Sequence, residues 1–263
     1  MILNLLKHGI CQLGLFGGPT NGNDWTFIGH FDGRGYLISN IQITTSLAST
    51  TTTYNYVGLF GVVHGMVRNL GVQGAINIGS GAGRSRVGLL AACNEAGSAS
   101  RTGLIESCYA IVDVSYFGVH FTDNMQDVGL LVGYNVTGAK IINCYAVGTV
   151  TTNTVSNVTT SNINTGGLVG RNATSASITN CYADVVVEAN HSGCSRGALV
   201  GNNPSGSGNV VNSYAGTGGV DGFGTGVTPS PAIKPIADLN ASLDDLPSIP
   251  CTSDGVNGFY PFW

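Results

Sequence analysis

A six-residue pattern recurs along this chain and constrains its fold more than any other feature. It reads Ile-x-Asn-Cys-Tyr-Ala, with weaker copies early in the chain and a serine in place of the cysteine in the last copy. Copies begin at Ile38, Val67, Ile105, Ile141, Ile178 and Val210. Successive copies lie 29 to 38 residues apart. A period of this length indicates one supersecondary unit per repeat, stacked on its neighbours.

A second unit alternates with the first and reads Gly-Leu-Val-Gly. Its copies fall at 58–61, 90–92, 131–133, 167–170 and 198–201, and the last four are followed by Asn94, Asn135, Asn172 and Asn203. We interpret its glycines as tight corners whose backbone conformation excludes a side chain. Between the two units lie β-branched stretches such as 147–150 and 185–187, which favour strands. Each repeat therefore holds about three short strands separated by Gly, Asn and Ser/Thr turns.

These features predict an all-β fold, a right-handed parallel β-helix (β-solenoid) of about six coils with capping segments. The 40 glycines and the abundant Thr, Asn and Val disfavour helices. We assign an N-terminal cap to 1–23, the β-solenoid repeats to 24–228 and a Pro-containing capping tail to 229–263, because uncapped coil ends would expose unpaired strand edges. A β-propeller with antiparallel strands is the alternative, although the uneven repeat length suits a coil with extruded loops better.

Composition excludes several partners and compartments. With ten Lys and Arg residues and a net charge of −4, the chain lacks the basic stripe that nucleic acid requires. The sequence contains no run of about 18 apolar residues, so we expect no transmembrane segment. The first eight residues have no basic region followed by a sustained apolar region, so they do not form a clear signal peptide.

The repeats carry a family resemblance. Gly-Gly-Leu-Val-Gly at 166–170 followed by Ile-Thr-Asn-Cys-Tyr-Ala at 178–183 resembles the GLUG-motif repeats of bacterial surface proteins, adhesins and some immunoglobulin A peptidases. Residues 25–40 look like the opening coil of such arrays, and 258–263 like their closing segment. The resemblance implies an extracellular stalk or adhesive module. The peptidases of that group carry their zinc site outside the repeats, and the sequence contains no His-Glu-x-x-His.

Stacked coils place equivalent residues about 4.8 Å apart, so the repeats predict three structural ladders. The first, interrupted by Ser107, has amides that bond from coil to coil and satisfy backbone groups at a bend. It comprises Asn40, Asn69, Asn143, Asn180 and Asn212. The second comprises Cys108, Cys144 and Cys181, and the third Tyr109, Tyr145, Tyr182 and Tyr214. The tyrosines either pack or, facing outward, form a stripe that stacks on sugars; packing is favoured.

The repeats predict a structural role for the stacked cysteines. Parallel side-chain vectors on adjacent coils fit disulfide geometry poorly, so the stacked cysteines are expected to be small buried apolar residues. The odd total of seven leaves at least one free thiol. A bridge among Cys11, Cys93, Cys194 and Cys251 stays open.

A search for chemistry finds no convergent catalytic set, cofactor motif or metal-ligand spacing. Asp123 and Asp127 share one long inter-strand stretch with His120. These three residues could form a weak cation site, but we favour the interpretation that they lie in a solvated loop. The acids Asp113, Asp184 and Glu188 fall out of register with one another, so adjacent coils would not pair them. Residues 32–35, Asp-Gly-Arg-Gly, suit a turn between two strands. Glycosylation sequons begin at Asn135, Asn157, Asn172, Asn190 and Asn240.

We therefore expect a non-catalytic extracellular or cell-surface module, structural or adhesive, rather than an enzyme. It is expected to associate with itself in a fibre or sheath, or to bind a host or cell-surface glycan or protein. The alternative is a β-helix protein that binds polysaccharide or degrades it as a lyase or hydrolase, since such enzymes place clustered acids on the coils.

Overall fold

The structure is a computed structural model, which describes residues 26–46, 54–82, 84–97, 102–118, 125–154, 162–189, 194–204 and 209–216. Every segment with regular structure in this part of the chain is a β-strand. The cap expected at 1–23 and the tail expected at 229–263 lie outside the described residues, as do Cys11, His120, Asp123 and Cys251.

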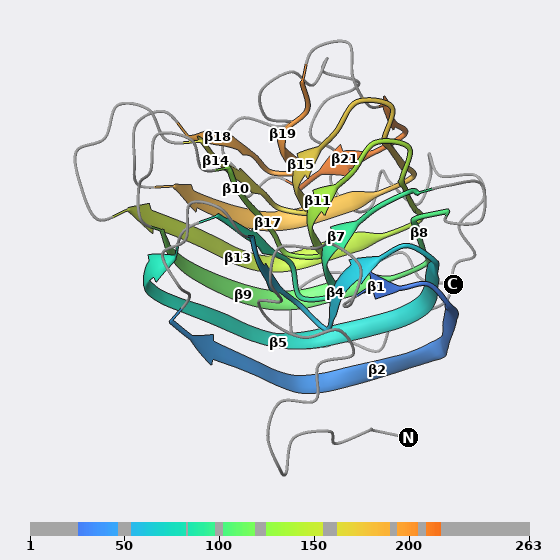
Figure 1. Ribbon diagram of the computed structural model, residues 1–263, viewed down its shortest axis with the longest axis horizontal. Coiled ribbons are helices and arrows are strands. Elements are labelled where there is room, and N and C mark those ends of the chain that lie inside the picture. Colours follow the sequence, from blue (N-terminus) through green and yellow to red (C-terminus); the bar gives the residue numbers. More distant parts are fainter. Residues whose placement is uncertain are drawn as a thin grey trace.

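The strands form three parallel sheets, here called A, B and C, which the chain visits in that order in each coil (Figure 1). Sheet A contains β1 (Thr26–Phe27), β4 (Phe60–Val63), β7 (Ala91–Asn94), β11 (Val132–Asn135), β15 (Val169–Asn172) and β19 (Val200–Asn202). Sheet C contains β3 (Asn55–Val57), β6 (Ser85–Val87), β10 (Met125–Gly129), β14 (Asn162–Gly166) and β18 (Ser195–Gly197).

Sheet B is the broadest and bends in the middle. Its first two layers are the long strands β2 (His30–Thr45) and β5 (Met66–Ala82). Each later layer is split at the bend: β8 (Leu104–Glu106) and β9 (Tyr109–Gly118), β12 (Lys140–Ile142) and β13 (Tyr145–Thr154), β16 (Ser177–Thr179) and β17 (Tyr182–Ala189), β20 (Asn209–Val211) and β21 (Tyr214–Ala215). The β-solenoid prediction is confirmed, and the propeller alternative is wrong because the pairings are parallel.

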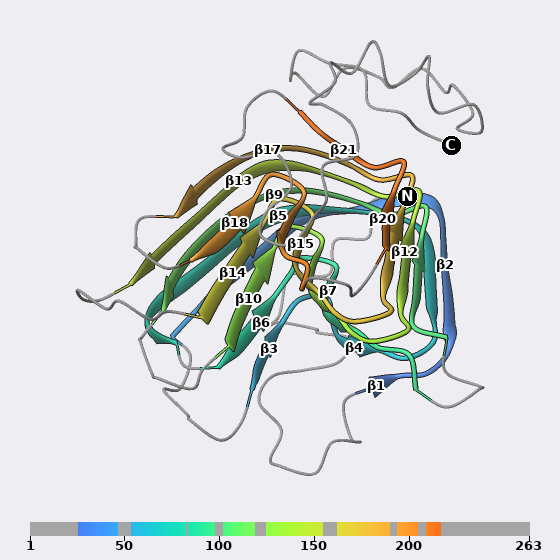
Figure 2. The same cartoon turned by 90° about the horizontal axis from the view of Figure 1, so that it is seen from above.

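The bend in sheet B is made by one residue per layer in the left-handed region. Their φ values lie between 46° and 61°, and they are Asn40, Asn69, Ser107, Asn143, Asn180 and Asn212. Asparagine adopts this region more readily than most residues because its short polar side chain bonds locally. Figure 2 shows the two arms of sheet B meeting at this line. The repeated asparagine therefore encodes a corner.

The core lies inside the coil and is filled by alternate residues of each strand. In β9 the side chains of Ala110, Val112 and Val114 belong to it, whereas the residues between them face outward. This period of two is the pattern expected for a strand with one buried face. The register repeats it from layer to layer, since Val150 of β13 lies opposite both Val114 and Val187.

Sheets C and A are joined by a short turn that points into the core. The turn leucines are fully buried at Leu89, Leu90, Leu130, Leu131, Leu168 and Leu199. The two sheets therefore converge on this turn, as Figure 2 shows, and their outward faces meet. We call this contact between the outward faces of sheets A and C the seam.

The glycines of Gly-Leu-Val-Gly line the foot of the seam. Our interpretation that they need a special backbone conformation is wrong, since positive φ among the described glycines occurs only at Gly35, Gly103, Gly138 and Gly148. Space is the reason instead. A Cβ on Gly170 of sheet A would lie 2.5 Å from the amide nitrogen of Val128 on sheet C, and one on Gly129 of sheet C would lie 2.7 Å from the amide nitrogen of Gly170. The backbones of the two sheets touch there.

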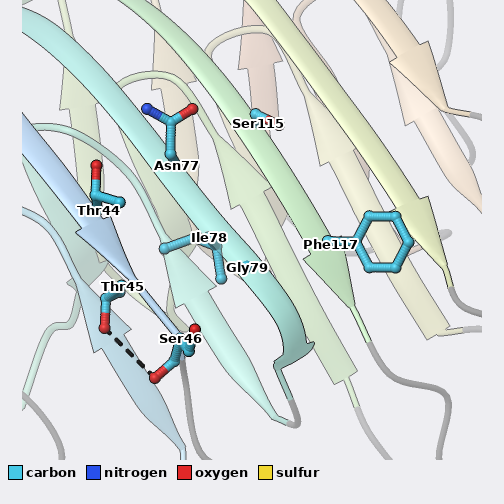
Figure 3. A pocket seen from close by; sticks show the side chains of 8 residues that line it. All are labelled: Thr44, Thr45, Ser46, Asn77, Ile78, Gly79, Ser115 and Phe117. Atoms are coloured by element: carbon cyan, nitrogen blue, oxygen red, sulfur yellow. Dashed lines mark hydrogen bonds between the residues drawn. The ribbon is translucent and has the colours of Figure 1, made fainter.

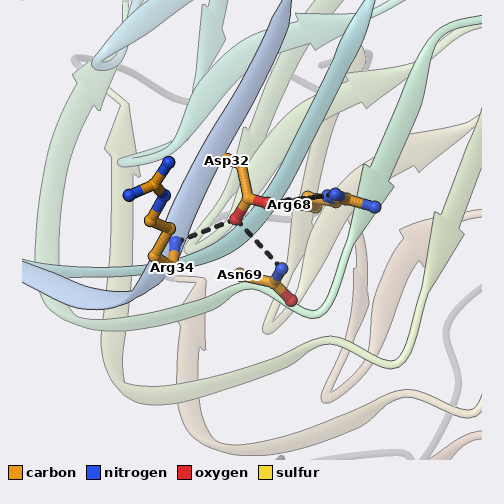
Figure 4. A network of polar contacts seen from close by, with 4 residues as sticks. All are labelled: Asp32, Arg34, Arg68 and Asn69. Atoms are coloured by element: carbon orange, nitrogen blue, oxygen red, sulfur yellow. Dashed lines mark hydrogen bonds and ion pairs between the residues drawn. The ribbon is translucent and has the colours of Figure 1, made fainter.

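Residues 32–35 are not a turn between two strands, as their sequence suggested. They form a bulge within β2, where the register shifts between Asp32 and Tyr36. Asp32 accepts hydrogen bonds from the Arg34 backbone at 2.9 Å and from Asn69 at 3.0 Å, and it pairs with Arg68 at 3.0 Å (Figure 4). The Arg34 amide and then the Asn69 amide hold the pKa of the Asp32 carboxyl below its usual value. An exposed carboxylate thus organises the bulge.

Candidate functional site

The asparagines that follow Gly-Leu-Val-Gly form a continuous buried amide ladder. Asn94 donates to the side-chain oxygen of Asn135 at 2.9 Å, Asn135 to Asn172 at 2.8 Å, and Asn172 to Asn203 at 2.9 Å. Asn94 and Asn135 also donate to backbone oxygens of the following sheet B strands, at Lys140 and Ser177. The ladder ties each turn from sheet A to the layer beyond it. We noted this recurring asparagine in the sequence but did not expect a ladder there.

The asparagines of the bend bond less regularly than we expected. Asn180 donates to Asn143 at 3.2 Å, whereas Asn69 donates to Asp32 instead of to another member. Asn40 and Asn212 are exposed. What the positions share is therefore the left-handed backbone of the bend, and amide pairing is secondary.

The stacked cysteines are free, buried thiols. Each sulfur lies near the carbonyl oxygen two residues earlier, at 3.2 Å for Cys108, 3.1 Å for Cys144 and 3.2 Å for Cys181. The Cys144 sulfur accepts the backbone N–H of Cys108, the Cys181 sulfur accepts that of Cys144, and the Ser213 hydroxyl accepts that of Cys181 at 3.0 Å. Burial raises the pKa of Cys108 to about 12. The Cys108 thiol therefore stays protonated, and all three side chains serve packing. The off-ladder Cys93 and Cys194 are free as well, so no bridge joins them.

The four tyrosines stack in register on the outward face of sheet B, yet three are almost fully buried. Tyr145 pairs with Tyr109 and Tyr182, and Tyr182 with Tyr214. The rings of Tyr109 and Tyr145 are parallel, with centroids 4.9 Å apart. Tyr145 and Tyr182 are each 2% exposed. Outward orientation and burial thus coexist, so these rings do not form an open stripe for sugars.

A cluster of arginine and tyrosine side chains occupies the seam. Arg86 donates to the Tyr56 hydroxyl at 3.2 Å and to Cys93 at 3.4 Å. Its guanidinium lies 4.2 Å from the ring centre of Tyr54 and 4.6 Å from that of Tyr134. Contacts of this kind attract a cation electrostatically to the ring face. Because Arg86 is on sheet C whereas Cys93 and Tyr134 are on sheet A, the cluster holds the two sheets together.

Asp127 belongs to this cluster, which corrects its placement in a solvated loop. It lies on β10, opposite Arg86 and Asn164, and is 1% exposed. Asn164 donates to its Oδ1 at 2.7 Å, while Oδ2 has no hydrogen-bond partner. Burial raises the pKa of Asp127, and the charges of Arg86 and Arg171 offset part of that rise. The geometry is that of a buried structural carboxylate.

The structure also corrects two expected glycosylation sites. Asn135 and Asn172 are fully buried members of the amide ladder, so an oligosaccharide transferase cannot reach them in the folded chain. Asn157, Asn190 and Asn240 lie outside the described residues.

Of the acids considered for chemistry, Asp113 and Glu188 lie opposite threonines, Asp184 lies opposite Val147, and none of the three lies opposite another. Within the described residues no group of three or more His, Cys, Asp or Glu is placed to hold a metal ion.

An open hollow of about 600 Å³ lies on the outward face of sheet B, where β2, β5 and β9 end (Figure 3). Its lining is uncharged: Thr44, Thr45, Ser46, Asn77, Ile78, Gly79, Ser115 and Phe117. Sequence reasoning missed it, because these residues share no motif and are brought together only by the register of three coils. None of the ladder residues lines it.

The fold and the ladders define a parallel β-solenoid built from short repeats. Two segments, 126–151 and 161–188, match the model of the GLUG motif, so the chain carries GLUG-motif repeats. Over 82% of this chain and 68% of the other, it is similar to a solved structure from Bacteroides ovatus, a candidate immunoglobulin A1 protease, at 19% identity and a TM-score of 0.46. No curated protein sequence matches the chain. No helix in the described part of the chain could cross a membrane.

Proposed function

We propose that this chain is a non-catalytic β-solenoid module that acts outside the cell or at its surface, as a stalk or an adhesive element. The observation that carries the proposal is the buried amide ladder from Asn94 to Asn203, which links four consecutive layers. Buried hydrogen bonds between successive layers resist shear between coils, because breaking one leaves unpaired amides in the core. A coil tied in this way suits a load-bearing support.

The outward face of sheet B supports an adhesive role. One column of residues opposite one another across its layers is mostly short and uncharged; it comprises Thr44, Asn77, Ser115, Thr151 and Glu188. Such a face offers hydroxyl and amide groups at the spacing of the strands, about 4.8 Å. It can therefore bind a partner over several layers without a deep pocket.

Protease treatment of intact cells that make the protein tests the proposed location. An antibody against the chain should detect a signal at the cell exterior or in the medium, and added protease should remove the cell-bound part. Detection only in lysed cells would overturn the proposal.

Enzyme activity on polysaccharide is the competing function. The purified protein should not turn over pectin, alginate or related polymers, with or without calcium. Asp127 would be the first residue to test if turnover appeared, but its burial means that a loss of activity counts only for variants shown to be folded.

A further inference from the structure

The hollow on sheet B is shaped by a missing side chain. Ile78 on β5 pairs in register with Tyr116 on β9, and the register shifts just beyond this pair, in the stretch that contains Gly79 and Phe117. On the other side, a Cβ on Gly79 would meet the Ser46 hydroxyl at 3.1 Å. Gly79 is therefore an exposed floor between Ser46, which directly follows β2, and Phe117 on β9. These two strands lie two layers apart, about 10 Å.

The walls of this hollow carry matched polar and aromatic groups. Thr44, Asn77 and Ser115 stand opposite one another in register beside the floor, and all three are exposed. Figure 3 shows the Asn77 amide and the Phe117 ring on neighbouring strands. Hydroxyl and amide groups can both donate and accept hydrogen bonds. An aromatic ring supplies an apolar surface for stacking.

The chemistry of the lining selects the ligand class. A charged ligand would lose water here without gaining an opposite charge, which is costly. A purely apolar ligand would leave the hydroxyls and amide facing it without partners. A neutral sugar ring presents hydroxyl groups at its edge and C–H groups on its face, so it satisfies both parts of the lining.

We propose that this hollow binds a neutral hexose unit of a glycan, with the sugar ring over Gly79 and against Phe117 and its hydroxyls bonded to Ser46 and Asn77. The inference rests on the proposed adhesive function and assigns its ligand class. It places the sugar-binding surface away from the buried tyrosine column, near the ends of β2, β5 and β9.

Titration of the purified full chain with neutral pentasaccharides of glucose and mannose, by calorimetry, tests the inference, with trigalacturonate as the charged comparison. Saturable binding of a neutral oligosaccharide is expected. Gly79→Val fills the floor and Phe117→Ala removes the ring, and each should weaken binding about ten-fold or more. Phe117→Tyr keeps the ring, and Thr149→Val changes the same face outside the hollow, so both should bind as the parent does.

Three results would overturn the inference: no neutral oligosaccharide binds, Gly79→Val binds normally, or trigalacturonate binds more tightly. Circular dichroism shows which variants are folded, and Gly79→Val carries the test if Phe117→Ala unfolds, because Gly79 is exposed. The proposed surface location fails separately, in the protease assay on cells. Sugar binding by a protein found only inside cells would keep this inference and reject the location.

Discussion

The side-chain amide of Asn94 donates a 2.9 Å hydrogen bond to the side-chain oxygen of Asn135, one layer further along the solenoid. Both residues are fully buried. A buried amide is stable only when its donors and acceptor are paired, so this bond makes each layer dependent on the next. The ladder therefore stabilises the stack of coils as well as the individual turn.

Removing one rung should reveal that dependence. Asn135→Ala leaves the donor of Asn94, the acceptor of Asn172 and the backbone oxygen of Ser177 without their partner. We expect the free energy of unfolding to fall by about 2–5 kcal/mol, since each buried unpaired group costs about 1–3 kcal/mol. Urea denaturation measures it. Asn77→Ala, on the exposed face, is the control and should change stability by less than about 0.5 kcal/mol; equal losses would contradict a role for the ladder.

The bend should distinguish glycine from alanine. Asn143 has a φ of 54°, where alanine is strained and glycine is not. Both substitutions lose the bond from Asn180, so Asn143→Gly should be more stable than Asn143→Ala by about 1 kcal/mol in thermal unfolding. At Thr149, whose φ is not positive, the order should reverse because glycine is disfavoured within strands. The same order at both positions would show that the bend does not require this conformation.

A methyl group at the foot of the seam should be poorly tolerated. In Gly170→Ala the new Cβ meets backbone atoms, among them the amide nitrogen of Val128 on sheet C at 2.5 Å, which cannot move without disturbing the strands. We expect a loss of about 1–3 kcal/mol, as for an overpacked core, measured by urea denaturation. In Gly79→Ala the nearest atom to the new Cβ is the flexible Ser46 hydroxyl at 3.1 Å, so this variant should be close to neutral. Comparable stability of the two variants would argue against backbone contact between sheets A and C.

The thiols of the cysteine column should be replaceable by hydroxyls. Ser213 already accepts the N–H of Cys181 at 3.0 Å and bonds the Val211 oxygen at 2.9 Å, which are the contacts the cysteines make. Cys144→Ser should therefore change the free energy of unfolding by less than about 1 kcal/mol, whereas the branched Cys144→Val should cost about 1–3 kcal/mol by overpacking. Thermal unfolding compares the two. A severe loss in the serine variant would mean that sulfur itself is required.

Asp127 should make stability depend on pH. Its pKa is raised in the folded state by burial, so its protonated form is favoured there. Its contribution to stability is then full below the unfolded pKa of about 3.9 and is lost as pH rises through the folded pKa. Asp127→Asn should therefore gain stability relative to the parent between pH 4 and pH 7. Urea denaturation at both values measures this, and an unchanged difference would show that Asp127 ionises without penalty.

Individual elements show how far sequence reasoning reaches. The repeated asparagine predicted a bend, and the structure has a corner there. The stacked cysteines were expected to be buried, and Cys108, Cys144 and Cys181 are buried free thiols. Asp127 was misplaced, however. It lies in a weakly repeated stretch of the sequence. Its neighbours along the chain do not predict its contacts with Asn164 and Arg86, which are 37 and 41 residues away.

The sequence by itself determined the period, the strand content and the residue at each corner, because these depend on local conformation and on what recurs from one coil to the next. Only the tertiary structure decided which outward-facing side chains are buried. The turn between sheets C and A points inward, so outward-facing side chains such as Arg86 and Asp127 become enclosed where two sheets meet. The hollow at Gly79 likewise exists only through the register of three coils. Contacts across sheets join residues distant in sequence, so no local pattern encodes them.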